Sequence, residues 1–335
     1  MDMLVVMKRP QQPAGHAPPR RSGSARRTSS IDVSWPDGRE GNLRFDARAR
    51  DVVTPRAGGA PIVCAEDAYV ARIGRDRTVL AIEATPARKA MPQLVGKRGG
   101  GHLRMALEEV MPEERRNATP LYLILDDISG ASLVAGWAWS LWDPQWLETM
   151  RKAMNDPAMS KSFPDRAGIC SGFAPGSSAF TENVDRNPTP VPDLRNPADP
   201  DGWHAFTEQK NIGMRRARRI DVWVDELIHI ETAFQDSAST PAGGRAAVHE
   251  YRLSATADPV TRQLLSAQAE PRILPFPECT NAPGNLQRLL GTPLPELRAR
   301  VLAELRGTAG CTHLNDVMRA LAEVPALVEH LRRRA

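Results

Sequence analysis

The sequence predicts an α+β fold of two pseudo-symmetric halves, each an antiparallel β-sheet packed with helices that follow it in the chain. Two observations lead to this prediction. In each half, segments that alternate apolar and polar residues come first and amphipathic helical segments come later, as in α+β proteins. The halves also share landmark residues at a constant spacing, which indicates an internal duplication. With 41% hydrophobic and 25% charged residues among 335, the composition is that of a globular protein.

Residues 1–27 precede the first predicted strand and are rich in Pro, Arg, Gly and Ser. Such a segment buries too little apolar surface to offset its ordering entropy, so we expect a disordered basic tail. The tail carries much of the excess of 44 basic over 40 acidic residues, and the net charge of the whole chain is only +4. This balance argues weakly for nucleic acid, and we expect none as a partner.

No targeting or membrane segment is recognisable in the sequence. The apolar run in residues 4–7 is too short for the core of a signal peptide, and no stretch approaches the roughly 18 to 20 apolar residues of a membrane span. The four cysteines, Cys64, Cys170, Cys279 and Cys311, lie far apart and form no CxxC pair. We therefore expect reduced thiols, a cytoplasmic location and no membrane partner.

The first half, residues 28–140, opens with predicted strands. Apolar residues alternate with charged ones through Leu43, Phe45 and Ala47, which is the period-two pattern of a strand buried on one face. A proline-bounded connection and helices complete the half. The strands of this half are expected at 31–35, 43–53, 68–73 and 78–84.

The second half, residues 215–335, repeats this order. Ile228 and Ile230 alternate with polar residues in a predicted strand. Later, the segments around Val301 and Val317 each place their apolar residues on one helical face.

The duplication is supported by landmarks that recur at one offset. Asp236 follows Asp51, and Pro271 follows Pro86, by the same 185 residues. A constant offset over several landmarks is what two copies of one structural unit would show. We interpret residues 28–140 as a diverged copy of the second half.

Residues 141–214 connect the halves through a Trp-rich helical segment, a Gly/Ser loop and a Pro-rich linker. The tryptophans form either a packing surface between the halves or an aromatic wall of a ligand pocket. Four of the seven tryptophans of the chain lie together here: Trp137, Trp139, Trp142 and Trp146.

Four residues are candidates for substrate binding. Trp137 and Trp142 come from the tryptophan cluster, and Cys170 lies in the loop GICSGFAPGSSAF, whose Gly and Ser residues expose backbone N–H groups to an anion. Arg218 lies in the basic run MRRARRID, which forms either a solvated face or a site for an anionic substrate.

The decapeptide GTAGCTHLND, residues 307–316, places a thiol, a hydroxyl and an imidazole in consecutive positions, Cys311, Thr312 and His313. At the aligned place the first half has ISGASLV around Gly130. The glycine and the small hydroxyl residue are kept in both halves and suit a turn and a helix cap. The thiol and the imidazole occur only in the second half, so they are candidates for function.

Two further places in the second half carry reactive side chains where the first half has mostly neutral ones. His249 and Glu250 lie in VHEY, and Glu278 and Cys279 follow Pro277. The catalytic candidates are His313, Cys311, His249 and Glu250.

Several chemistries suit these residues. The positive end of a helix dipole lowers the pKa of a nearby thiol, which favours a thiolate at Cys311. His313 or His249 can transfer protons near neutral pH, and Glu250 or Glu278 can orient an imidazole. Zinc is the alternative, although the C-x-H spacing matches no common zinc motif. We therefore expect either no cofactor or a zinc ion, and we commit to no metal ligands. If zinc is bound, its ligands are His249, Cys279, Cys311 and His313.

The second half resembles the bacterial family of proteins of unknown function numbered 2889 (DUF2889). The resemblance rests on the Arg-rich run that leads into Ile-Asp-Val, on Asp236, on VHEY, on Pro277 and Cys279, and on GCTHL followed by an amphipathic helix. It covers residues 215–335. It implies a bacterial cytoplasmic protein with a recurring His/Cys site, and an enzyme for small organic, for example aromatic, substrates.

We therefore expect an enzyme of lyase or hydrolase type that acts at a cleft between the halves. His313 and His249 are the expected acid/base groups, and Glu250 is the expected orienting group. The alternative is a non-catalytic ligand-binding or protein-interaction scaffold. The expected partner is a small-molecule substrate, and assembly into a homo-oligomer is left open.

Overall fold

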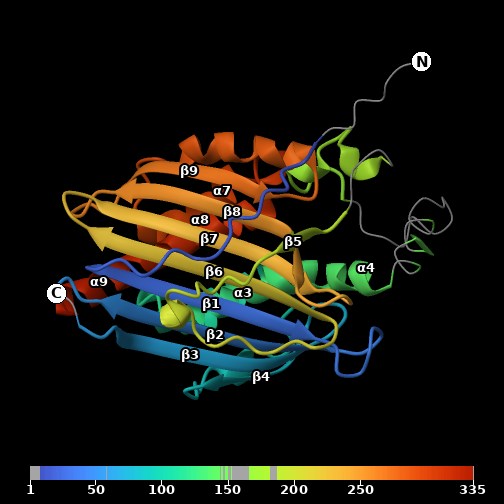
Figure 1. The fold of residues 1–335 in the computed structure, drawn as a ribbon, viewed down its shortest axis with the longest axis horizontal. Coiled ribbons are helices and arrows are strands. Elements are labelled where there is room, and N and C mark those ends of the chain that lie inside the picture. Colours follow the sequence, from blue (N-terminus) through green and yellow to red (C-terminus); the bar gives the residue numbers. More distant parts are fainter. Residues whose placement is uncertain are drawn as a thin grey trace.

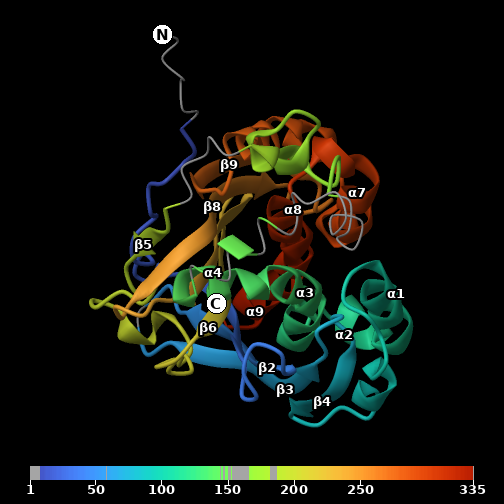
Figure 2. The same ribbon diagram turned by 90° about the vertical axis from the view of Figure 1, so that its right-hand side faces the viewer.

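The computed structural model describes residues 8–57, 59–143, 145, 148–149, 152, 166–181 and 187–334. Its centre is one antiparallel sheet of nine strands with helices on one face (Figure 1 and Figure 2), which confirms the predicted α+β class. The strands are β1 (Ser24–Ser34), β2 (Leu43–Thr54), β3 (Ile62–Ile73), β4 (Val79–Thr85), β5 (Thr189–Val191), β6 (Gly213–Val224), β7 (Ile228–Ser239), β8 (Arg245–Ala257) and β9 (Leu264–Ile273). The α-helices are α1 (Gly101–Val110), α2 (Pro112–Arg116), α3 (Pro120–Val134), α4 (Ala138–Trp142), α7 (Leu297–Glu304), α8 (Thr312–Arg319) and α9 (Val324–Arg334).

Strands from both predicted halves join in this one sheet. Its order is β4-β3-β2-β1-β6-β7-β8-β5, and β9 also pairs with β8. β1 pairs with β6 along its whole length, from Ser24 opposite Trp223 to Ser34 opposite Gly213. Backbone hydrogen bonds thus connect the halves, and our expectation of a cleft between them is wrong for the sheet. The pseudo-symmetry of the halves stays a prediction.

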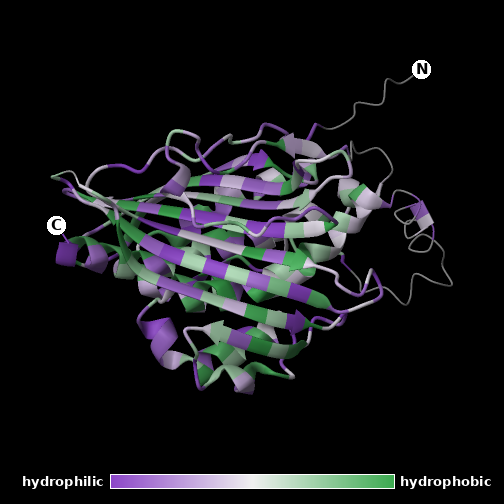
Figure 3. Cartoon of the chain, turned by 60° about the horizontal axis from the view of Figure 1, so that its bottom comes forward, coloured by the Kyte–Doolittle hydropathy of each residue, from purple (hydrophilic) through white to green (hydrophobic). Residues whose placement is uncertain are grey.

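Alternating residues set the face that each strand presents. Along β2, Leu43, Phe45 and Ala47 are buried under the helices, whereas the residues between them are more exposed, as Figure 3 shows by the banding of hydropathy along the strands. β1 and β6 are instead buried on both faces. Residues 8–23 and 187–212 cover their second face, where His204 lies between the hydroxyls of β1.

The prediction of a disordered tail is wrong for residues 8–27. β1 already begins at Ser24, and the residues before it run along the second face of the sheet. There the amide of Ala14 donates to Glu250 Oε2 at 2.8 Å, and the amide of Ala17 donates to the carbonyl of Leu194 at 2.9 Å. The composition of the segment does not reveal these long-range partners. Residues 1–7 lie outside the described part of the chain.

The helices press two apolar clusters against the sheet. One lies between β6–β9 and α7–α9 and contains Phe234 and Val301. The other lies mainly between β1–β4 and helices α1 and α3, and contains Phe45 and Leu125. The helical faces predicted around Val301 and Val317 are largely buried in the first cluster, as their periodicity indicated, but Leu302, predicted on the Val301 face, is exposed.

Helix α3 corrects the expected alignment of the two halves. Gly130 lies inside α3, so ISGASLV is not the start of a helix. The helix begins after Thr119, whose hydroxyl accepts a hydrogen bond from the amide of Tyr122 at 3.3 Å.

One helical stretch in the described residues, Pro120–Trp142, is long and apolar enough to cross a membrane by those two measures. Its most apolar window is 72% buried inside the protein, which is the environment of a core helix. The cytoplasmic location stays a prediction.

Candidate functional site

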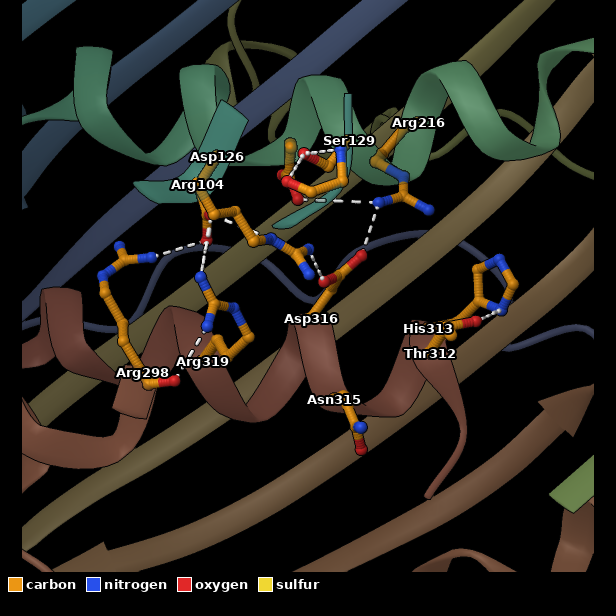
Figure 4. Close-up of polar contacts among 12 residues, drawn as sticks. Arg104, Asp126, Ser129, Arg216, Arg298, Thr312, His313, Asn315, Asp316 and Arg319 are labelled. Atoms are coloured by element: carbon orange, nitrogen blue, oxygen red, sulfur yellow. Dashed lines mark hydrogen bonds and ion pairs between the residues drawn. The ribbon is translucent and has the colours of Figure 1, made fainter. Parts of the chain in front are cut away.

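A buried ionic network joins the helices to the sheet. Arg216 donates from Nε and Nη2 to the two carboxylate oxygens of Asp236, at 2.9 and 3.0 Å, and from Nη1 to Asp316 Oδ2, at 2.8 Å. Asp316 Oδ1 accepts from Arg104, which also contacts Asp126 (Figure 4). Positive and negative groups balance, as buried charges require. The network consists of Arg27, Arg104, Arg216, Arg218, Arg298 and Arg319 with Asp51, Asp126, Asp127, Asp236, Asp316 and Glu323.

Gly130 lets α3 approach this network. A Cβ atom at Gly130 would lie 1.8 Å from Arg216 Nη1 and 2.6 Å from Asp316 Oδ2. The residue must therefore be glycine because of this close approach, and not because of a turn.

Asp236, His249 and His313, here called the Asp–His–His centre, come from three elements. Asp236 on β7 lies opposite His249 on β8, and the register shifts immediately after this pair. The extra residue of the resulting β-bulge is Val248, and bulges re-aim the side chains next to them. His313 lies in the first turn of α8, and its ring stacks on that of His249 with the centroids 3.3 Å apart.

The two imidazoles face the same carboxylate oxygen. His249 Nδ1 lies 3.5 Å and His313 Nε2 lies 3.6 Å from Asp236 Oδ2. Neither nitrogen has a hydrogen-bond partner among the described residues, although His249 and His313 are only 6% and 9% exposed. Buried polar atoms are nearly always hydrogen-bonded, so these two nitrogens mark a candidate site.

Burial and Arg216 set the protonation states of the centre. Burial alone would raise the pKa of Asp236, but the Arg216 guanidinium outweighs it and holds that pKa well below its usual range. Burial lowers the pKa of His249 in spite of the nearby Asp236 carboxylate. Burial and the adjacent His249 lower the pKa of His313 further. At pH 7 the centre therefore holds one ionised carboxylate and two neutral imidazoles.

Cys311 lies at the N-cap of α8, but it is not activated there. Burial raises the pKa of its thiol, because desolvation of a thiolate outweighs the helix dipole that we expected to lower it. Its Sγ accepts from the Tyr251 hydroxyl at 3.5 Å and lies 4.0 Å from His313 Nδ1. The Thr312 hydroxyl lies 3.3 Å from the same nitrogen, and no side chain caps the helix.

Glu250 and Glu278 do not orient an imidazole, contrary to our expectation. Glu250 follows His249 on a strand, so its side chain points to the opposite face, where it accepts from Gln235 Nε2 at 2.9 Å. Glu278 accepts from the amide and the hydroxyl of Ser178, at 2.9 and 2.7 Å, and thereby anchors the Gly/Ser loop.

The structure brings together only part of the predicted zinc set. His249 and His313 meet, but Asp236 completes the group whose ligand atoms all lie within 4.8 Å of one another. Within the described residues, neither Cys279 nor Cys311 belongs to that group. Sequence reasoning used Asp236 only as a landmark, because a strand pairing that places it opposite His249 is not visible in local patterns.

The predicted Gly/Ser loop covers the cysteines beside the centre. The amide of Ser171 donates to the carbonyl of Gly310 at 2.8 Å, so the loop lies against the start of α8. A Cβ atom at Gly172 would lie 2.5 Å from Cys279 Sγ and 3.9 Å from Cys170 Sγ, which leaves no room for a larger residue. Burial raises the pKa of both thiols, so they are protonated at neutral pH.

Arg218 and Trp142 have structural partners. Arg218 donates to both carboxylate oxygens of Asp127, at 2.7 and 3.0 Å, so its charge is already neutralised within the protein, and its role in substrate binding stays a prediction. Trp142 Nε1 donates to the carbonyl of Ser239 at 2.8 Å and holds α4 against β7.

Trp137 of the tryptophan cluster lines a cavity. The cavity has a volume of about 150 Å³, and its lining includes Phe276 and Val248, the bulge residue before His249. Trp139 packs edge-on against Trp35, with centroids 5.6 Å apart. Trp146 lies outside the described residues.

Comparison with known families matches residues 214–327 to the model described as "Protein of unknown function (DUF2889)". The matched region is the C-terminal part of the chain. This region contains Arg216 and all three residues of the Asp–His–His centre. No curated protein and no solved structure matches the chain.

Proposed function

We propose that the protein is an enzyme of lyase or hydrolase type that acts on a small organic molecule at the Asp–His–His centre. One observation carries the proposal: two buried imidazoles face one carboxylate oxygen, and no hydrogen bond in the described structure satisfies either facing nitrogen. Histidines that only support a fold usually have such bonds. Polar groups held together without them are typical of sites that await a substrate or another ligand.

The centre can supply a base. That base is either an imidazole nitrogen or a water molecule held by the centre, and it takes a proton from the substrate or from water. Asp236, fixed by two hydrogen bonds from Arg216, stabilises positive charge that develops next to it. A base of this kind serves both proton abstraction in an elimination and activation of water in a hydrolysis.

The cavity beside the β-bulge supports a small substrate. Its volume of about 150 Å³ suits a molecule on the order of one ring, and Trp137 and Phe276 give it aromatic walls. Val248 lines the cavity and precedes His249 in the chain, so the cavity and the centre both adjoin the β-bulge of β8.

The test compares wild-type protein with the His249→Ala and His313→Ala variants on a panel of small esters, lactones, amides and hydroxy acids. We expect an activity that falls by about 10²–10⁴-fold in either variant, the usual contribution of general acid–base catalysis. His330→Ala is the matched control, because His330 also contacts a buried carboxylate that is paired with an arginine. Unchanged activity in both variants, with folding confirmed by circular dichroism, would contradict the proposal.

A non-catalytic ligand-binding protein is the second candidate. It is favoured by a groove of about 980 Å³ between α2, α9 and the start of α3, whose walls include Arg115, Arg116, Arg333 and His330. A thermal shift with small carboxylates or phosphates that His330→Ala abolishes and His313→Ala preserves would support this candidate instead.

A further inference from the structure

The donor atoms of the Asp–His–His centre are those of a transition-metal site. Two imidazoles and one carboxylate are ligands that zinc and non-haem iron prefer. Among the described residues, Asp236, His249 and His313 are the one group of His, Cys, Asp or Glu side chains whose ligand atoms all lie within 4.8 Å of one another. We propose that these three residues bind a divalent cation of the zinc class.

The distances fit such a cation. A metal at about 2.0–2.1 Å from each ligand, with tetrahedral angles, holds its ligand atoms about 3.3–3.4 Å apart. Asp236 Oδ2 lies 3.5 Å from His249 Nδ1 and 3.6 Å from His313 Nε2. Both oxygen–nitrogen distances therefore exceed those around a bound metal by only a few tenths of an ångström, and the two nitrogens lie within 4.8 Å of each other.

The two unpartnered nitrogens are the second, independent observation. The side chains of His249 and His313 are only 8% and 11% exposed, yet His249 Nδ1 and His313 Nε2 have no hydrogen-bond partner in the described structure. Both are directed at a carboxylate oxygen. If these nitrogens carry lone pairs, they repel that oxygen, and a cation between them turns the repulsion into coordination.

The neighbours of the ligands are those of a prepared metal site. A ligating histidine usually donates its second ring N–H to an oxygen, and His313 Nδ1 lies 3.3 Å from the Thr312 hydroxyl. A ligating carboxylate is usually held by hydrogen bonds, and Arg216 donates to both oxygens of Asp236. Thr312 and Arg216 are therefore positioning residues for the site.

Charge indicates what completes the coordination. The ionic network around Arg216 already balances six arginines with six carboxylates, so a divalent cation adds two uncompensated positive charges. Hydroxide or the carboxylate of a substrate would offset part of that charge. This step rests on the proposed function, and it names an anionic oxygen donor as the substrate class.

Binding requires one change in the structure. The rings of His249 and His313 are stacked with 18° between their planes, so their lone pairs lie in nearly parallel planes. A cation binds in the plane of each imidazole, so one ring must turn and the stacking must end. The ring nitrogens of both histidines should therefore change their NMR shifts when metal is added.

The experiment titrates EDTA-treated full-length protein with Co²⁺, followed by its visible absorption, and with Zn²⁺, followed by calorimetry. We expect one ion per chain for wild type and for the control His330→Ala. We expect at least 100-fold weaker binding for His249→Ala, His313→Ala and Asp236→Asn. Equal binding by wild type and the His249→Ala variant, or no binding by folded wild type, would overturn the proposal.

A second measurement uses wild-type protein alone, and it tests the proposal even if the variants do not fold. Nitrogen-15 spectra of the histidine rings in wild-type protein, with and without Zn²⁺, should show a shift at two rings and none at His330. Shifts confined to other histidines would overturn the proposal. Activity that survives metal removal but depends on His313 would reject the cation and keep the proposed enzyme. Tight metal binding by wild type, together with full activity of the His313→Ala variant, would keep the cation and reject the proposed enzyme.

Discussion

Two arginine–aspartate pairs lie under the helices, one on β1 and β2 and the other on β6 and β7. Arg27 faces Asp51 across β1 and β2, and Arg216 faces Asp236 across β6 and β7. Each arginine donates from Nε and Nη2 to both oxygens of its aspartate. In both places the strand register shifts immediately after the aspartate. The two pairs therefore have the same local framework.

The surroundings of the two pairs differ. At Asp51 a single histidine, His330 of α9, contacts the carboxylate at 3.2 Å and lines the large groove. At Asp236 two histidines face the carboxylate, and the loop at Ser171 lies against the start of α8. The difference indicates that each arginine–aspartate pair stabilises the fold. The chemistry that we propose at Asp236 depends on the two histidines that lie beside that pair.

The largest effect should come from removing either arginine. Arg216→Met leaves Asp236 buried without its arginine and removes one of the two arginines that contact Asp316, and Arg27→Met does the same to Asp51 and Glu323. We expect each change to lower the free energy of unfolding by about 3–5 kcal/mol, as broken buried ion pairs do. Urea denaturation measures it, and a small loss at one pair only would show that the pairs are not equivalent in the fold.

The second effect tests the packing of α3 against the Arg216 pair. A methyl group at Gly130 collides with Arg216 Nη1, so Gly130→Ala should destabilise the protein by up to about 3 kcal/mol. Gly136→Ala is the control, because nothing lies within 4 Å of a Cβ atom there, and it should be neutral or slightly stabilising. Thermal unfolding of both variants checks this, and equal behaviour would show that α3 adjusts freely.

Acid should weaken the Asp236 pair before the Asp51 pair. Burial lowers the pKa of His249 and His313 below the unfolded value of about 6.5, so the unfolded state binds more protons below that pH. Their contribution to stability is present above pH 6.5 and lost as the pH falls, by about 2 kcal/mol at pH 5 for each histidine that stays neutral. Arg27 holds the pKa of Asp51 below its usual range in spite of burial, so that contribution is lost only below about pH 4.

Urea titrations of metal-free protein between pH 7.5 and 5 measure this loss. They should be made in a His204→Gln background, because burial lowers the pKa of His204 to about 3 and gives a loss of the same sign. Adding His313→Gln should flatten the remaining pH dependence, and adding His330→Gln should not. An equal flattening by both would remove the distinction between the two pairs.

The smallest effect belongs to His330→Ala. The side chain is partly exposed, and Asp51 keeps both hydrogen bonds from Arg27 without it. We expect a loss of less than about 1 kcal/mol in the free energy of unfolding. Chemical denaturation at pH 7.5 checks it, and a loss as large as that of Arg27→Met would make His330 part of the framework.

Local patterns in the sequence predicted most of the elements. The alternation through Leu43 and Phe45 corresponds to β2, and the apolar faces around Val301 and Val317 correspond to α7 and α8. The patterns failed where long-range partners decide the structure. Residues 8–23 are ordered by the second face of the sheet, and Gly130 is explained only by a residue 86 positions away, Arg216.

The site was predicted in part for the same reason. His249, Cys311 and His313 were selected because the first half lacks them, and the structure brings the two histidines together. Asp236 was not recognised as a site residue and Glu250 was assigned wrongly, because strand pairing and strand faces decide which carboxylate meets an imidazole. An arginine and an aspartate at matching places in both halves were the unused signal.

The ionic network also constrains how this protein can change over evolutionary time. Arg216 contacts Asp236 and Asp316, and Arg298 contacts Asp126 and Glu323, so a single substitution removes a partner from more than one opposite charge. Single substitutions at these positions are therefore expected to be destabilising and rarely accepted. Related sequences should either keep the whole set or replace several members together with apolar residues of similar volume.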